Sequence, residues 1–63
     1  MYKLRTLGKR AKAARLEKGW SLDVLAEKTG LSKSFLSEME RGKKYPTLST
    51  LDNISRKLGI KLI

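Results

Sequence analysis

Four glycines divide this chain into segments that each have the length of one short helix. They are Gly19, Gly30, Gly42 and Gly59, and the single proline, Pro46, lies between the last two. The segments show almost none of the strict alternation of polar and apolar residues that is typical of a half-buried strand. Because glycine is common just after the last residue of a helix, this spacing favours several short helices over a sheet.

Apolar residues recur at helical spacing inside each segment, and polar residues that cap helices precede three of the segments. We therefore expect four helices: one over about residues 4–18, and three that begin after Ser21, Ser32 and Thr47. The expected buried stripes are Leu4, Leu7, Ala11 and Ala14; Leu22, Leu25, Ala26 and Thr29; Phe35, Leu36 and Met39, with Leu31 just before them; and Leu48, Leu51, Ile54 and Leu58.

The prediction is an all-α, four-helix fold in a single domain over residues 1–63, since a chain of 63 residues is short for more than one domain. The last residues, Ile60-Lys61-Leu62-Ile63, are rich in branched side chains. A short C-terminal strand therefore stays open for this tail.

The charge of the chain points to a polyanionic partner. Fifteen Lys and Arg residues stand against six Asp and Glu residues, which makes a formal net charge of +9, and the isoelectric point is about 10.3. Such a charge repels itself in the compact state and attracts nucleic acid or an anionic membrane surface. The composition alone favours nucleic acid.

Several functions are excluded or disfavoured by what the sequence lacks. It has no Cys and no His, which removes disulfides, thiolate catalysis and the commonest metal ligand and general base. We find no nucleophile–base set and no glycine-rich phosphate loop, so we expect no enzyme, no metal site and no cofactor. No apolar run approaches the roughly 20 residues that span a bilayer, and we expect a cytoplasmic protein.

The stretch from Leu22 to Arg41 carries the most informative pattern. Two short capped helices are joined by a turn at Gly30, and Ala26 is small where the second of them has to pack closely. The second helix has short polar side chains on its expected outer face. This is the composition of a helix-turn-helix, whose second helix is free to enter the major groove of DNA.

Residues 21–42 resemble the Cro/phage-repressor (Xre-type) helix-turn-helix family. The segment from Arg15 to Ser21 resembles the approach to that motif, and Pro46 to Ile60 resembles the family's fourth helix. The resemblance implies a transcriptional regulator, most simply a repressor, of bacterial or phage origin. It would bind double-stranded DNA of specific sequence as a homodimer on a palindromic operator. The family commonly has glutamine where this chain has Leu22, whose side chain cannot hydrogen-bond to phosphate.

The resemblance also implies roles for individual residues on the DNA side. The positions at which the family contacts base edges are occupied by Lys33, Ser34, Ser37 and Glu38. An ordinary solvated helix face is the alternative for these four, and Glu38 could simply pair with Arg41. The positions that contact phosphate are occupied by Ser21, Lys43, Lys44, Tyr45 and Thr47, for which a basic solvated loop is the alternative.

Two further sets have structural roles in the family. Arg15 and Glu40 match a partly buried ion pair between the first and third helices. Ile60, Leu62 and Ile63 are dimer candidates, because some antitoxin members pair a C-terminal strand across the dimer. A tail folded back on its own core is the alternative.

Two other functions stay open at this stage. An antitoxin would bind operator DNA and also hold a toxin protein as its partner. A membrane-surface protein would use the basic first helix, although the stripe of Leu4, Leu7, Ala11 and Ala14 is thin for anchoring. We therefore expect no membrane partner.

Overall fold

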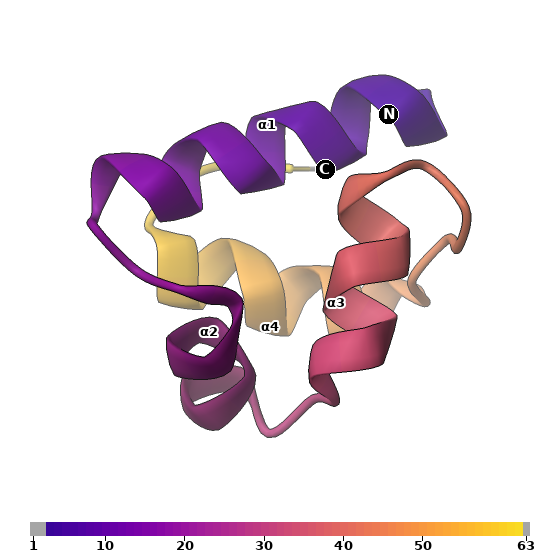
Figure 1. Cartoon of the computed structure of the whole chain (residues 1–63). Helices are drawn as coiled ribbons and strands as arrows, with labels where there is room; N and C mark the ends of the chain where they lie inside the picture. Colours follow the sequence, from indigo (N-terminus) through magenta and orange to yellow (C-terminus); the bar gives the residue numbers. More distant parts are fainter. Residues whose placement is uncertain (1–2, 63) are drawn as a thin grey trace.

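The computed structural model describes residues 3–62 and has four helices (Figure 1). They are α1 (Leu4–Glu17), α2 (Leu22–Thr29), α3 (Lys33–Glu40) and α4 (Leu48–Leu58). No strand occurs within residues 3–62. The predicted all-α, four-helix fold is confirmed.

Local sequence signals define where the helices begin and end. The hydroxyl oxygens of Ser21, Ser32 and Thr47 each accept a hydrogen bond from the backbone N–H three residues later, at 3.2, 3.0 and 3.2 Å. These are the N-caps that the sequence predicts. Helices α2 and α4 end at Gly30 and Gly59, whose φ angles of 75° and 70° lie in the left-handed region that favours glycine.

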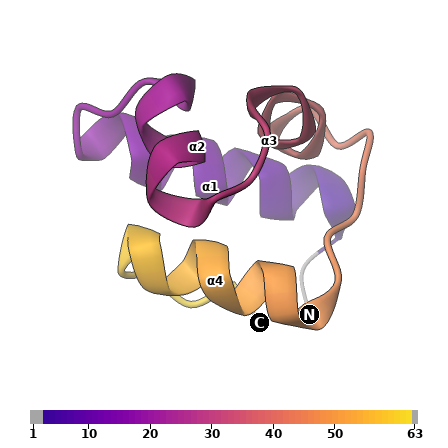
Figure 2. The same cartoon turned by 90° about the horizontal axis from the view of Figure 1, so that it is seen from below.

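The core lies between the four helices and draws on all of them. Helices α1 and α2 each pack against both α3 and α4, and Figure 2 shows α2 and α3 side by side with α4 along one side of them. The fully or almost fully buried apolar residues are Leu7, Ala11, Leu25, Leu36, Met39, Leu51, Ile54, Leu58 and Leu62.

Several residues of the expected stripes are only half-buried, and another, Leu48, is exposed. Leu48 is 60% exposed, because it lies in the first turn of α4, beyond the edge of the core that begins at Leu51. Phe35 is only half-buried and packs against the rim of the core. Helical spacing identifies the side of a helix that faces inward, but it does not identify how far the core extends along that helix.

The chain after α4 turns back along α1 and does not form the strand that the sequence left open (Figure 1). Leu62 is fully buried in the core of its own chain, and the Arg10 Nη2 donates a hydrogen bond to the Lys61 carbonyl at 3.2 Å. Ile60 is half-buried, and Ile63 lies outside the described residues. Within the single chain, residues 60–62 therefore complete the core.

Helix α1 crosses the C-terminal end of α3 at a very short distance, and Gly8 makes this approach sterically allowed. A Cβ atom at Gly8 would lie 2.5 Å from the Met39 carbonyl oxygen and 2.6 Å from the Glu40 carbonyl oxygen. Both are backbone atoms that cannot move without shifting α3. Glycine usually weakens a helix by about 1 kcal/mol relative to alanine, but here the close crossing requires it.

We expect Gly8→Ala to lower the free energy of unfolding by about 1–3 kcal/mol, because overpacking against backbone outweighs the gain in helix propensity. Denaturant unfolding followed by circular dichroism measures this. Thr6→Ala, at an exposed position of the same helix, is the control and should change stability by less than about 0.5 kcal/mol. A Gly8→Ala variant more stable than the unchanged chain would contradict the close crossing.

Candidate nucleic-acid interface

Helix α3 has one buried side and one uncovered side. Leu36 and Met39 are fully buried against the other helices. The opposite side carries the four residues that the sequence predicts to contact bases, and none of the four is buried: Lys33 and Ser34 are exposed, and Ser37 and Glu38 are half-buried. The fold therefore brings these four side chains together on a surface that the rest of residues 3–62 leaves open.

A shallow hollow of about 440 Å³ lies along this uncovered side of α3. Its lining residues are Leu22, Lys33, Ser34, Ser37, Glu38 and Arg41. Two of these, Leu22 and Arg41, are not among the predicted contact residues. Arg41 shares the helical spacing of the other α3 residues, being four positions after Ser37, and this signal could have identified it.

Both carboxylates on this surface are paired with lysines. The Lys33 Nζ lies 3.4 Å from the Asp23 Oδ2, and the Lys44 Nζ lies 3.8 Å from the Glu38 Oε1. The side chains of Lys33 and Lys44 remain 59% and 57% exposed, so these pairs are weak and are readily exchanged for other anions.

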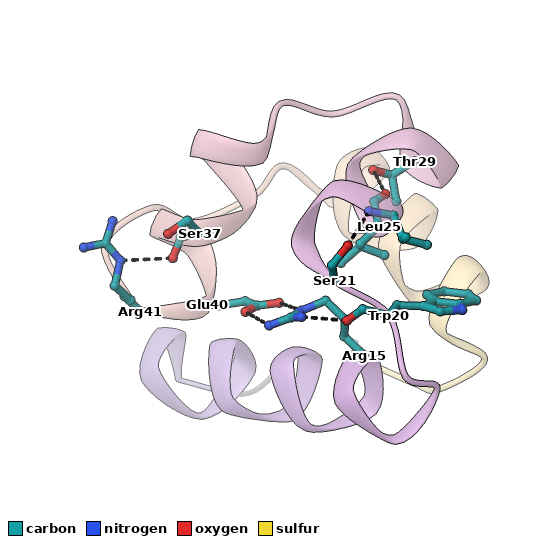
Figure 3. A network of polar contacts seen from close by, with 9 residues as sticks. Arg15, Trp20, Ser21, Leu25, Thr29, Ser37, Glu40 and Arg41 are labelled. Carbon is teal, nitrogen blue, oxygen red and sulfur yellow. Dashed lines mark hydrogen bonds and ion pairs between the residues drawn. The ribbon is translucent and has the colours of Figure 1, made fainter.

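The pairing of Glu38 with Arg41, an alternative at the sequence level, is not the arrangement in the structure. The Arg41 Nε donates a hydrogen bond to the Ser37 carbonyl at 3.3 Å instead. Figure 3 shows the remainder of the Arg41 guanidinium pointing away from the body of the molecule. Arg41 thus places a charged donor at the edge of the hollow.

The loop after α3 presents a basic surface next to the hollow. Its backbone folds back on α3, since the Lys43 N–H donates to the Glu38 carbonyl at 2.8 Å. Pro46 is buried and anchors the far end of the loop, whereas Lys43, Lys44 and Tyr45 are exposed. The predicted phosphate-contacting residues of this loop therefore lie beside the four predicted base-contacting residues.

Ser21 and Thr47, the other two predicted phosphate contacts, act as helix caps. A capping hydroxyl oxygen accepts a hydrogen bond and can still donate its own hydrogen. The Thr47 hydroxyl already has an acceptor in range, the Thr50 Oγ1 at 3.0 Å. Ser21 is therefore the better placed of the two to donate to an external oxygen.

The turn between α2 and α3 is braced by Thr29, which was expected only as a buried residue, and by Asn53, for which the sequence predicted no role. The Thr29 Oγ1 donates to the Leu25 carbonyl at 2.8 Å and accepts from the Leu31 N–H at 3.3 Å. The Asn53 Nδ2 of α4 donates to the Thr29 carbonyl at 2.8 Å. These bonds hold the end of α2 against α4 and so set the angle at which α3 leaves the turn.

Arg15 and Glu40 form a buried ion pair between α1 and α3 (Figure 3). The Arg15 Nε and Nη2 donate to the two carboxylate oxygens of Glu40 at 2.8 and 3.0 Å, and Nη1 donates to the Trp20 carbonyl at 2.8 Å. Only 7% and 5% of the two side chains are exposed. The pair ties α1, the α1–α2 loop and the end of α3 together.

Trp20 lies at the edge of the core, away from the hollow. Its ring is half-buried, with the Lys18 and Lys28 ammonium groups 5.1 and 4.8 Å from the ring centre. Ammonium groups over an indole ring at this distance make favourable cation–π contacts. The ring therefore has a packing role at the junction of α1 and α2.

The helix-turn-helix family model matches residues 12–63, which is most of the chain. This chain belongs to the HTH_3 helix-turn-helix family. The family resemblance predicted from the sequence is thereby confirmed, and the matched region contains all four predicted base-contacting residues.

Individual relatives of this HTH_3 chain are regulators. The immunity repressor protein of Bacillus phage phi105 is 44% identical over 57 residues, which are 90% of this chain but 40% of the repressor. The chain thus spans less than half the length of that repressor. The family and these relatives are transcriptional regulators, which confirms the expectation that this chain is not an enzyme.

Two solved structures have the same fold as this HTH_3 chain. One is the crystal structure of SinR, a master regulator for biofilm formation, in complex with DNA. Its sequence is 42% identical to this chain, the TM-score is 0.82, and the match covers 89% of this chain and 90% of that one. The restriction-modification controller protein C.AhdI from Aeromonas hydrophila is 30% identical with a TM-score of 0.87, covering 94% and 89% of the two chains.

Within residues 3–62, no group of three or more acidic side chains is arranged to hold a metal ion. In the same part of the chain, none of the four helices has the length and apolar character needed to cross a membrane.

We expect Arg15→Ala and Glu40→Ala each to lower the free energy of unfolding by about 3–5 kcal/mol, because each strands a buried charge. A double variant, Arg15→Met with Glu40→Leu, should be more stable than either single variant, since it removes both charges and keeps the volume. Denaturant unfolding of the four chains measures this. Single variants as stable as the unchanged chain would show that the pair is not buried in solution.

Proposed function

We propose that this HTH_3 chain binds double-stranded DNA of specific sequence and regulates transcription. The single observation that carries the proposal is the uncovered polar side of α3, bordered by the basic loop that follows it. The major groove of DNA is about 12 Å wide and admits an α-helix. Helix α3 would enter this groove with its buried side, at Leu36 and Met39, held by the rest of the fold.

The chemistry of the α3 side chains supports direct contact with base edges. A lysine such as Lys33 donates to the O6 and N7 of guanine, and a carboxylate such as Glu38 accepts from the N4 of cytosine. The hydroxyls of Ser34 and Ser37 can donate to or accept from any base. Arg41, at the end of the same side, is a further donor to guanine or to the backbone.

The basic loop supports contact with the sugar-phosphate backbone. Lys43, Lys44 and Tyr45 are exposed in the loop that follows α3, and the exposed Ser21 caps α2 directly before Leu22, which lines the hollow. We assign Thr47 to the same set, through its place at the start of α4. Such contacts set position and contribute most of the affinity, which then falls steeply with salt.

The proposal extends to a homodimer on a palindromic operator. A two-fold dimer would place two α3 helices in successive major grooves, about 34 Å apart. A second hollow, of about 460 Å³, lies between α4 and residues 59–62. Its lining combines Ile60 and Leu62 with the polar and charged residues Asp52, Ser55, Arg56 and Lys61. We assign this hollow to the dimer contact.

One relative supports repression over activation: the protein of Bacillus phage phi105 is named an immunity repressor. The structure of SinR in complex with DNA supports binding to DNA. We accordingly propose repression: the bound dimer would occupy the operator in the cytoplasm of a bacterial cell and exclude the transcription machinery.

Lys33→Ala is expected to relax the preference at one base pair of each half-site, by about 1–3 kcal/mol. Lys44→Ala should weaken binding to all sequences alike and lower, by about one unit, the slope of the logarithm of the binding constant against the logarithm of the salt concentration. Selection of duplexes from a random pool, followed by binding titrations at two salt concentrations, measures both effects. Lys57→Ala is the charge-matched control, since Lys57 is an exposed lysine in the last turn of α4. It should alter neither the base preference nor the contacts of α3 and the following loop with DNA.

Identical behaviour of Lys33→Ala and Lys44→Ala across sequences would show that the division into base and backbone contacts is wrong. Absence of any preferred duplex, with equal binding of all sequences, would reject sequence-specific regulation itself.

A further inference from the structure

Leu22 is the apolar residue among the polar residues that line the α3 hollow. It is the first residue of α2, and it is half-buried, with part of its side chain packed against the core. Among the described residues, the other five that line the α3 hollow are all polar or charged. The rest of the Leu22 side chain therefore gives the hollow an apolar patch in a surface otherwise built for hydrogen bonding.

The chemistry of the major groove contains one group that suits such a patch. Guanine, cytosine and adenine present hydrogen-bond donors and acceptors there, and thymine adds a C5 methyl group. A polar base group placed against Leu22 would lose its hydrogen bond to water without gaining another. A methyl group placed there removes apolar surface from water on both sides of the contact.

We infer that Leu22 contacts the C5 methyl of a thymine in each half-site and so selects thymine at that position. The inference rests on the proposed function and assigns a specificity role to a residue of α2. The charges around the hollow agree with it. The Lys33 Nζ lies 3.4 Å from the Asp23 Oδ2, and the Glu38 Oε1 lies 3.8 Å from the Lys44 Nζ, so both side chains have a charged neighbour other than the Leu22 patch.

Replacement of thymine by deoxyuridine tests the contact because it removes the methyl group and leaves every hydrogen bond of the base unchanged. The preferred duplex is first selected from a random pool with the unchanged chain. Each thymine in one half-site is then replaced singly by deoxyuridine, and binding is titrated at a fixed salt concentration. We expect one position at which the unchanged chain loses affinity about fourfold, the equivalent of about 0.8 kcal/mol for one buried methyl-sized group.

The Leu22→Ala variant should bind the thymine and deoxyuridine duplexes with nearly equal affinity at that position. Val24→Ala is the matched control: Val24 is an aliphatic residue of the same helix that is 38% exposed, but it does not line the hollow. The Val24→Ala variant should keep the fourfold ratio between the affinities for the thymine and deoxyuridine duplexes. Circular dichroism of both variants checks that they are folded, and if Leu22→Ala is not, Leu22→Gln takes its place as a polar variant of similar length.

Two results would overturn the inference while leaving the proposed function intact: a preferred duplex in which no thymine is sensitive to deoxyuridine, or an unchanged ratio in the folded Leu22 variant. Equal binding of all sequences would instead reject the proposed function, and the role of Leu22 with it.

Discussion

The crossing of α1 over the end of α3 is the contact on which the rest of the structure depends. Gly8 lets the two helices approach until a Cβ atom would lie 2.5 Å from the backbone of α3. Arg15 and Glu40 then join the same two helices through a buried pair that satisfies both oxygens of the carboxylate. Neither feature touches the outer side of α3. Together they fix the inner side of α3 against α1, and the outer side of α3 faces solvent.

The distribution of charge follows from this arrangement. The chain has a formal net charge of +9, and two of its acidic side chains, Asp23 and Glu38, lie 3.4 and 3.8 Å from the Nζ atoms of Lys33 and Lys44. Exposed pairs of this kind contribute little stability. In the proposed function, these lysines would offset the repulsion between the carboxylates and a polyanion, and they would remain exchangeable for phosphate.

Much of the fold was predictable because its signals are local. The capping residues Ser21, Ser32 and Thr47 act within one turn of themselves, so the helix starts could be inferred from sequence. Contacts between distant segments were not predictable in the same way. The bond from Asn53 to the Thr29 carbonyl joins residues 24 positions apart, and no periodicity indicates it. The exposure of Leu48 likewise depends on where the neighbouring helices end.

The sequence by itself determined the number of helices, their caps and the family, because these depend on residue types at fixed spacing along one chain. Only the tertiary structure decided that Leu62 completes the core of its own chain and that Leu22 and Arg41 border the same hollow as Ser34. Such neighbours are brought together by the angle between α2 and α3. That angle is set by packing and by bonds between separate helices, which a pattern along the chain does not encode locally.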